Sequence, residues 1–65
     1  MPLRFDIFKI YKNGEVLWLG AADEFQEVIR HALKQPVEAE IRFCLFDQSS
    51  GEVQYYRPED LLPYA

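Results

Sequence analysis

The sequence predicts a small α+β domain in which a four-stranded, mainly antiparallel sheet carries one helix on one face, in the order β-β-α-β-β. Two pairs of segments alternate polar with apolar residues, and turn residues join the members of each pair. Between the pairs, apolar residues recur at the spacing of an amphipathic helix. Because one helix of about twelve residues covers a single face of such a sheet, the other face is expected to be open.

The first pair of strands begins with residues 3–11, which are rich in aromatic and β-branched side chains. Their alternation slips between Ile7 and Phe8, which indicates either a bulge there or a central strand with both faces partly covered. Asn13-Gly14 follows and predicts a hairpin turn, because both residue types tolerate a positive φ. Residues 16–19 then form the returning strand.

Residues 23–34 predict one amphipathic helix, whose apolar positions are Phe25, Val28, Ile29, Ala32 and Leu33. Asp23 is expected to cap the first amides of this helix, with Gln26 completing an approximate capping box three residues later. Pro36 is expected to end it.

The second pair of strands begins with residues 37–47, a long alternating segment. Residues 48–51 supply a turn with a glycine, and residues 52–57 form the returning strand. Pro58 is expected to begin one short helical turn. No repeat or linker interrupts residues 1–65, which predicts a single domain.

Alternation assigns the side chains to two faces of the sheet. The helix-covered core is predicted to comprise Phe5, Ile7, Val16 or Leu17, Trp18, Phe25, Val28, Ile29, Ala32, Leu33, Ile41, Phe43, Leu45, Val53 and Tyr55. The other face is predicted to carry Arg4, Asp6, Phe8, Ile10, Leu17, Leu19, Arg42, Cys44, Phe46, Gln54 and Tyr56. That set is too apolar for an ordinary solvated face.

Two explanations for this apolar face remain open. Residues 61–64 could fold across part of it, or a second copy or another protein could pack against it. If the first and third strands are antiparallel neighbours, Phe8 and Ile10 come opposite Arg42 and Glu40. The resulting mixed surface suits a reversible contact better than an obligate one.

Composition limits the classes of function. A chain of 65 residues with one cysteine, Cys44, and one histidine, His31, has neither an internal disulfide nor an ordinary zinc site. Small domains without such staples often oligomerise. The net charge of −4 disfavours nucleic acid as a partner, and the absence of an apolar leader or long apolar run predicts a cytoplasmic protein without a membrane segment.

No catalytic residue, metal site or cofactor is expected. The sequence contains no Gly-rich phosphate loop, nucleophile elbow or metal-ligand spacing. Cys44 lies in the middle of a predicted strand, which is typical of a small apolar residue, although a thiol-dependent enzyme is a third hypothesis.

A set of motifs resembles small uncharacterised bacterial proteins. These motifs are Phe5-Asp6-Ile7-Phe8-Lys9, Val16-Leu17-Trp18, Ala22-Asp23 and Phe46-Asp47-Gln48 with Ser50-Gly51-Glu52. The resemblance implies a bacterial origin and a hairpin turn at residues 47–51, and it implies no particular activity.

The leading functional hypothesis is a non-enzymatic protein-interaction domain that forms a homodimer or binds a partner through the open sheet face. The residues expected to face the partner are Phe8, Ile10, Arg42, Phe46 and Tyr56. The alternative is a small-ligand or regulatory binding domain that uses the same face, with Arg42 and Tyr56 as polar anchors.

Overall fold

The computed structural model, which describes residues 3–34 and 40–64, has the predicted α+β architecture. Its elements are β1 (Phe5–Ile10), β2 (Val16–Ala22), α1 (Phe25–Leu33), β3 (Arg42–Asp47), β4 (Glu52–Tyr56), α2 (Pro58–Leu61) and the 3₁₀ turn η1 (Leu62–Tyr64). The four strands form one antiparallel sheet in the order β2-β1-β3-β4. β1 and β3 are therefore central, and β2 and β4 are edges.

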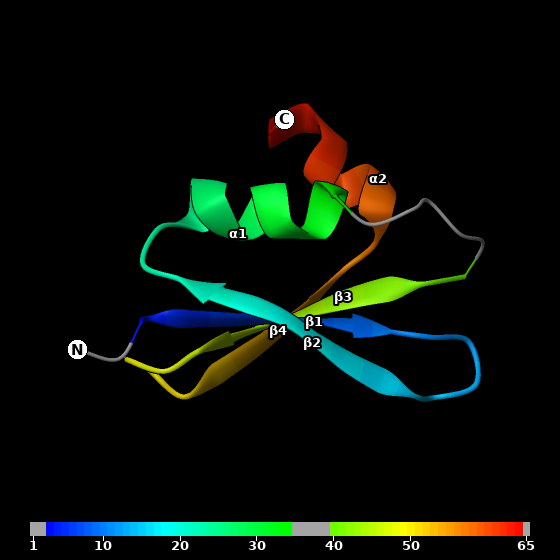
Figure 1. Ribbon diagram of the computed structural model, residues 1–65, viewed down its shortest axis with the longest axis horizontal. Coiled ribbons are helices and arrows are strands. Elements are labelled where there is room, and N and C mark those ends of the chain that lie inside the picture. The colour runs from blue at the N-terminus through cyan, green and yellow to red at the C-terminus, as the bar shows by residue number, and fades with distance from the viewer. Residues whose placement is uncertain (1–2, 35–39, 65) are drawn as a thin grey trace.

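All described helical segments lie on the same side of the sheet (Figure 1). α2 and η1 pack beside α1, where the ring of Tyr64 meets that of Phe25 edge-on, with centroids 5.5 Å apart. Leu61 of α2 is buried in the core. The proposal that residues 61–64 fold across the other face is therefore wrong, because Pro58 turns the chain toward the helix directly after β4.

The core lies between the helical layer and the sheet. Its fully buried apolar residues are Ile7, Ala22, Val28, Ile29, Ala32, Ile41, Phe43, Leu45 and Leu61. Phe5, Leu19, Phe25, Leu33 and Tyr56 pack against them and are partly buried. Leu19, Ala22, Tyr56 and Leu61 were not predicted to be core residues, and Leu19 and Tyr56 were predicted to lie on the other face.

The irregularity near Ile7 and Phe8 belongs to β2 rather than to β1. Ile7 pairs with Gly20 and Phe8 pairs with Trp18, so Leu19 has no opposite residue in β1 and forms a bulge. β1 itself alternates regularly. The alternation of polar and apolar residues slips in the sequence because a lysine occupies one of the buried positions of β1. Lys9 is only 2% exposed, and its Nζ lies 4.8 Å from the centroid of the Tyr11 ring.

The register of β4 reverses the predicted orientation of its side chains. Val53 pairs with Phe46 and Tyr55 pairs with Cys44, while Tyr56 pairs with Phe43. Directly opposite residues point to the same face of a sheet. Val53 and Tyr55 therefore lie on the open face, and Tyr56 lies on the helix side, against Phe25. The sequence-based prediction was wrong for all three residues.

The first hairpin has a three-residue loop. The Gly14 amide donates to the Tyr11 carbonyl at 2.9 Å, and Gly14 alone in this loop has a positive φ, of 90°. Asn13 does not adopt the positive φ that was predicted for it. Its Oδ1 accepts the amide hydrogen of Glu15 at 3.0 Å instead, which suits a type I turn followed by a glycine bulge.

The ends of α1 also differ from the prediction. The N-cap is Glu24, without a side-chain cap, so the predicted capping box at Asp23 and Gln26 does not form. Asp23 Oδ1 accepts the amide hydrogen of Arg4 at 3.3 Å instead. The proposed stop at Pro36 lies outside the described residues.

The third strand is shorter than predicted. It begins at Arg42 because Glu40 adopts φ 65°, which interrupts extended backbone just before it. Residues 37–39 of the predicted strand lie outside the described residues.

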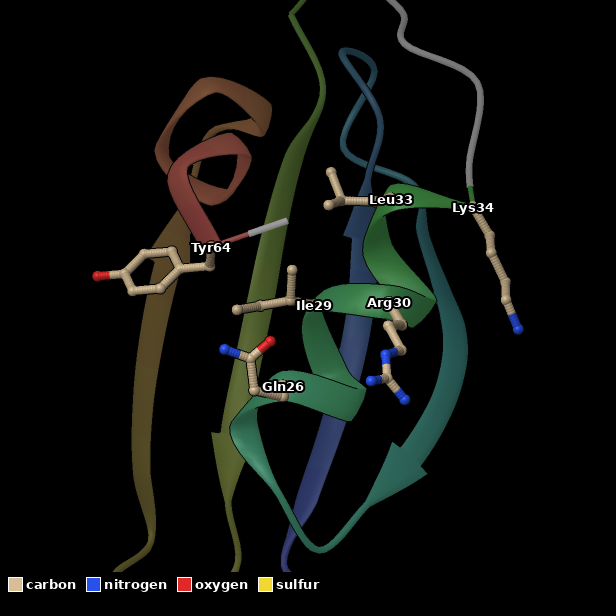
Figure 2. Close-up of a pocket in the computed structure, with 6 residues that line it drawn as sticks. All are labelled: Gln26, Ile29, Arg30, Leu33, Lys34 and Tyr64. Carbon is tan, nitrogen blue, oxygen red and sulfur yellow. The ribbon is translucent and has the colours of Figure 1, made fainter.

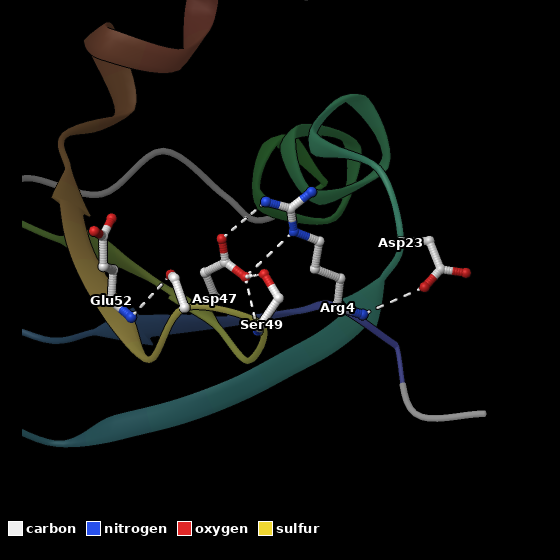
Figure 3. Close-up of polar contacts among 6 residues, drawn as sticks. Arg4, Asp23, Asp47, Ser49 and Glu52 are labelled. Atoms are coloured by element: carbon white, nitrogen blue, oxygen red, sulfur yellow. Dashed lines mark hydrogen bonds and ion pairs between the residues drawn. The ribbon is translucent and has the colours of Figure 1, made fainter.

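An ion pair joins the start of β1 to the end of β3 (Figure 3). Arg4 donates through Nε to Asp47 Oδ1 at 3.3 Å and through Nη2 to Oδ2 at 3.2 Å. Ser49 also donates to Asp47 Oδ1, from its hydroxyl at 2.7 Å and its amide at 3.0 Å. The hydrogen bonds from Arg4, and then those from Ser49, hold the pKa of Asp47 well below its usual range.

We expect acid to remove the stabilisation that this carboxylate provides. Because the pKa of Asp47 is lower in the folded chain, the stabilisation is full above the ordinary aspartate pKa of about 4 and is lost as the pH falls below it. Arg4→Met should lower the free energy of unfolding at pH 6 and make its decline toward pH 2 shallower, as measured by urea unfolding. Lys12→Met breaks the exposed Lys12–Glu40 pair and should leave that slope unchanged. An unchanged slope in Arg4→Met would contradict the assignment.

Candidate interaction surface

The sheet face opposite α1 carries three rows of side chains that run across the strands. The central row contains Trp18, Phe8, Cys44 and Tyr55. One flanking row contains Val16, Ile10 and Arg42, and the other contains Ala21, Asp6, Phe46 and Val53. These eleven residues are called the open face below.

Large apolar side chains on the open face are strongly exposed. The exposed fraction is 58% for Trp18 and 63% for Tyr55, at the two ends of the central row, and Val16 and Val53 are exposed as well. Phe8, Ile10 and Phe46, on the two central strands, are partly buried by their neighbours. A contiguous apolar surface of this kind is typical of an interaction site.

The polar groups of the open face lie toward opposite ends of the strands. Asp6 accepts a hydrogen bond from Trp18 Nε1 at 3.2 Å and another from Gln48 Nε2 at 2.5 Å. The first contact holds the Trp18 indole in place, and the second holds the Asp6 carboxylate. Arg42 is exposed in the opposite flanking row and has no ion pair with any residue in the described parts of the chain. The face is therefore acidic toward one end and basic toward the other.

Four of the five predicted partner-facing residues lie together here: Phe8, Ile10, Arg42 and Phe46. Tyr56 does not, because its register places it on the helix side. The predicted opposition of Phe8 to Arg42 is also wrong by two residues, since Phe8 lies opposite Cys44.

Sequence reasoning missed the most exposed apolar residues of this surface, Trp18, Tyr55, Val53 and Val16. Trp18 could have been assigned correctly from a three-residue loop in the first hairpin, because that loop sets Ile10 opposite Val16 and therefore Phe8 opposite Trp18. For Val53 and Tyr55, the available signal was the even number of residues in the turn between Asp47 and Glu52. Such a turn makes Asp47 and Glu52 direct partners, which places Val53 opposite Phe46 and Tyr55 opposite Cys44.

Cys44 lies in the middle of the central row and is partly buried. Burial raises the pKa of its thiol. A catalytic thiol needs the opposite shift, because the thiolate is the reactive form. This environment therefore favours an apolar role for Cys44 over the thiol-enzyme hypothesis.

The two residues predicted as polar anchors for a small ligand do not share a site, because Tyr56 lies on the opposite side of the sheet from Arg42. Two hollows in the described part of the molecule lie on the helix side. One is a shallow groove of about 410 Å³ between α1 and η1 (Figure 2). The groove is lined by Gln26, Ile29, Arg30, Leu33, Lys34 and Tyr64, and in that view Arg30 and Lys34 lie farther from Tyr64 than the other three residues of α1 do.

The described residues contain no group of three or more His, Cys, Asp or Glu side chains that could hold a metal ion. Among the helices of the same residues, none has the length and apolar character needed to cross a membrane. No protein-family model, curated protein or solved structure matches this chain.

Proposed function

We propose that this chain is a protein-interaction domain that self-associates by packing the open faces of two copies against each other. The observation that carries the proposal is the central row, in which Trp18 and Tyr55 remain more than half exposed at opposite edges of one apolar surface. Aromatic residues in such positions dominate the energetics of protein interfaces.

The placement of charge favours a second copy as the partner. In a dimer whose two-fold axis runs along the central row, the two kinds of flanking row meet each other. The row that holds Arg42 in one copy then packs over the row that holds Asp6 and Phe46 in the other copy. A guanidinium there can pair with the Asp6 carboxylate or lie over the Phe46 ring. The face is therefore complementary to itself in one orientation.

The size of the face predicts a reversible dimer. Four strands spaced about 4.8 Å apart, each contributing about six residues of 3.3 Å, project an area of roughly 400 Å². A stable interface buries about 800 Å² on each partner. We therefore expect a monomer–dimer equilibrium at micromolar concentrations or above rather than a permanent dimer.

Trp18→Lys and Tyr55→Lys are each expected to abolish self-association in sedimentation equilibrium. Each variant buries a charge in the interface, and a lysine at position 18 can still pair with Asp6 in the monomer. Leu62→Lys is the matched control, because Leu62 is exposed to the same degree as Trp18, 59% against 58%, but lies on the helix side.

The two lysine variants also separate face packing from pairing between edge strands. Trp18 lies on one edge strand and Tyr55 on the other. Face packing requires both variants to weaken association, whereas pairing through a single edge requires only one to do so. A strictly monomeric unaltered chain, or a Leu62→Lys variant as weak as Trp18→Lys, would overturn the proposal.

Trp18 provides a second readout, because it is the single tryptophan of the chain. Its emission should move to shorter wavelength as protein concentration rises, and should not move in Tyr55→Lys. The orientation can be tested by mixing Arg42→Asp with Asp6→Arg. Each variant alone should be monomeric, and the mixture should associate if the two charged ends meet.

A further inference from the structure

A second hollow lies on the helix side of the sheet, above the end of the β3–β4 hairpin. It has a volume of about 130 Å³ and is lined by Phe5, Phe25, Leu45, Asp47, Glu52, Gln54 and Tyr56. It exists because α1 has only nine residues and packs chiefly on β1 and β2. From α1, the Phe25 ring reaches toward β4, with its centroid 6.2 Å from that of Tyr56.

The walls of this hollow combine aromatic rings with carboxylates. Phe5, Phe25 and Tyr56 supply the rings. Asp47 and Glu52 are direct partners in the β3–β4 register and therefore point to the same face. Like charges placed opposite each other across two strands are destabilising, so a cation between them would stabilise this end of the sheet.

The chain itself places one cation at the side of this hollow. The Arg4 guanidinium carbon lies 4.8 Å from the centroid of the Phe5 ring, and its nitrogens pair with Asp47. Within residues 3–34 and 40–64, no cationic side chain pairs with Glu52. Figure 3 shows the carboxyl groups of Glu52 and Asp47 directed to the same side of the hairpin.

We propose that this hollow binds a small organic cation of the alkylammonium class, between Glu52 and the rings of Phe25 and Tyr56. Aromatic faces attract such cations, and a net charge of −1 from Asp47, Glu52 and Arg4 favours a single positive charge. The volume is close to that of a cavity of about 150 Å³ that holds benzene, which fits a trimethylammonium group. The site lies on the opposite side of the sheet from the open face and does not depend on self-association.

The test is an NMR titration of the Trp18→Lys chain at low ionic strength with choline and with its uncharged analogue 3,3-dimethylbutan-1-ol. The two probes have nearly the same shape and differ in charge. Choline should give saturable shifts at the amides of Gln54 and Tyr56 and at the Phe25 ring. It should bind about fivefold more tightly than the alcohol, the factor expected for one unit charge about 4 Å away in water.

Glu52→Gln should weaken choline binding about fivefold and leave binding of the alcohol unchanged. Glu27→Gln is the matched control, because Glu27 is an exposed carboxylate on α1 that does not line the hollow. Equal affinity for the two probes, equal effects of the two variants, or no saturable shift with choline would each overturn the proposal. None of these outcomes bears on dimer formation, which is measured with the unaltered chain.

Discussion

Phe43→Ala is expected to destabilise the domain severely. Phe43 is 2% exposed and lies on a central strand, facing α1. Truncating a buried phenylalanine costs about 3–5 kcal/mol, because apolar burial is lost and a cavity remains. At about 0.05–0.15 kcal/mol per residue, the whole free energy of unfolding of this chain is about 3–10 kcal/mol. One substitution therefore removes a large part of the stability.

Far-UV circular dichroism and urea unfolding would measure this effect. Phe46→Ala is the matched control, because Phe46 has the same side chain, lies three residues along the same strand and points to the open face. It should remain folded at 25 °C while losing self-association. If Phe43→Ala kept a cooperative transition at the same urea concentration as the unaltered chain, the core assignment would be wrong.

Gly20→Ala is expected to be the most damaging of the glycine substitutions. Gly20 has φ 153°, a conformation that costs an L-residue about 1–3 kcal/mol. A Cβ at this position would also lie only 3.2 Å from two atoms of the His31 ring. Gly20 thus allows the His31 side of α1 to approach β2 closely, beside the Leu19 bulge.

A double-mutant cycle with His31→Ala separates the two causes. The contact with the ring should disappear in the His31→Ala background, while the backbone strain should persist. Gly14→Ala is the control for strain alone, because Gly14 has φ 90° and a Cβ there would meet no atom within 4 Å. Thermal unfolding should therefore rank Gly20→Ala below Gly14→Ala in stability. The reverse order would contradict a close approach at Gly20.

The helix and the strands could be predicted because their signals are local. The period of Phe25, Val28 and Ile29 depends only on residues a few positions apart, and it identified the buried side of α1. Gly14 and Gly51, which both have positive φ, likewise marked both hairpin turns. The cap of α1 was less predictable, because Asp23 has a tertiary partner in Arg4 that competes with the local hydrogen bond.

The candidate surface could be predicted only in part, for a reason of register. On the two central strands, Phe8, Ile10, Arg42 and Phe46 lie on the predicted face of the sheet, because the side chains of these strands alternate regularly. On the edge strands, the three-residue loop of the first hairpin and the turn after Asp47 decide which side chains point outward. Those two features reversed Trp18, Tyr55 and Tyr56 relative to the prediction.

By itself, the sequence determined the order of the elements, the buried side of α1, the positions of both hairpins and the excess of apolar residues over what one helix can cover. Only the tertiary structure decided which side chains form that excess. Successive side chains of a strand point to opposite faces of the sheet, so a shift of one residue in the pairing register exchanges the two faces. The same register brought Asp47 opposite Glu52, a pair of like charges that a pattern of polar and apolar residues does not reveal.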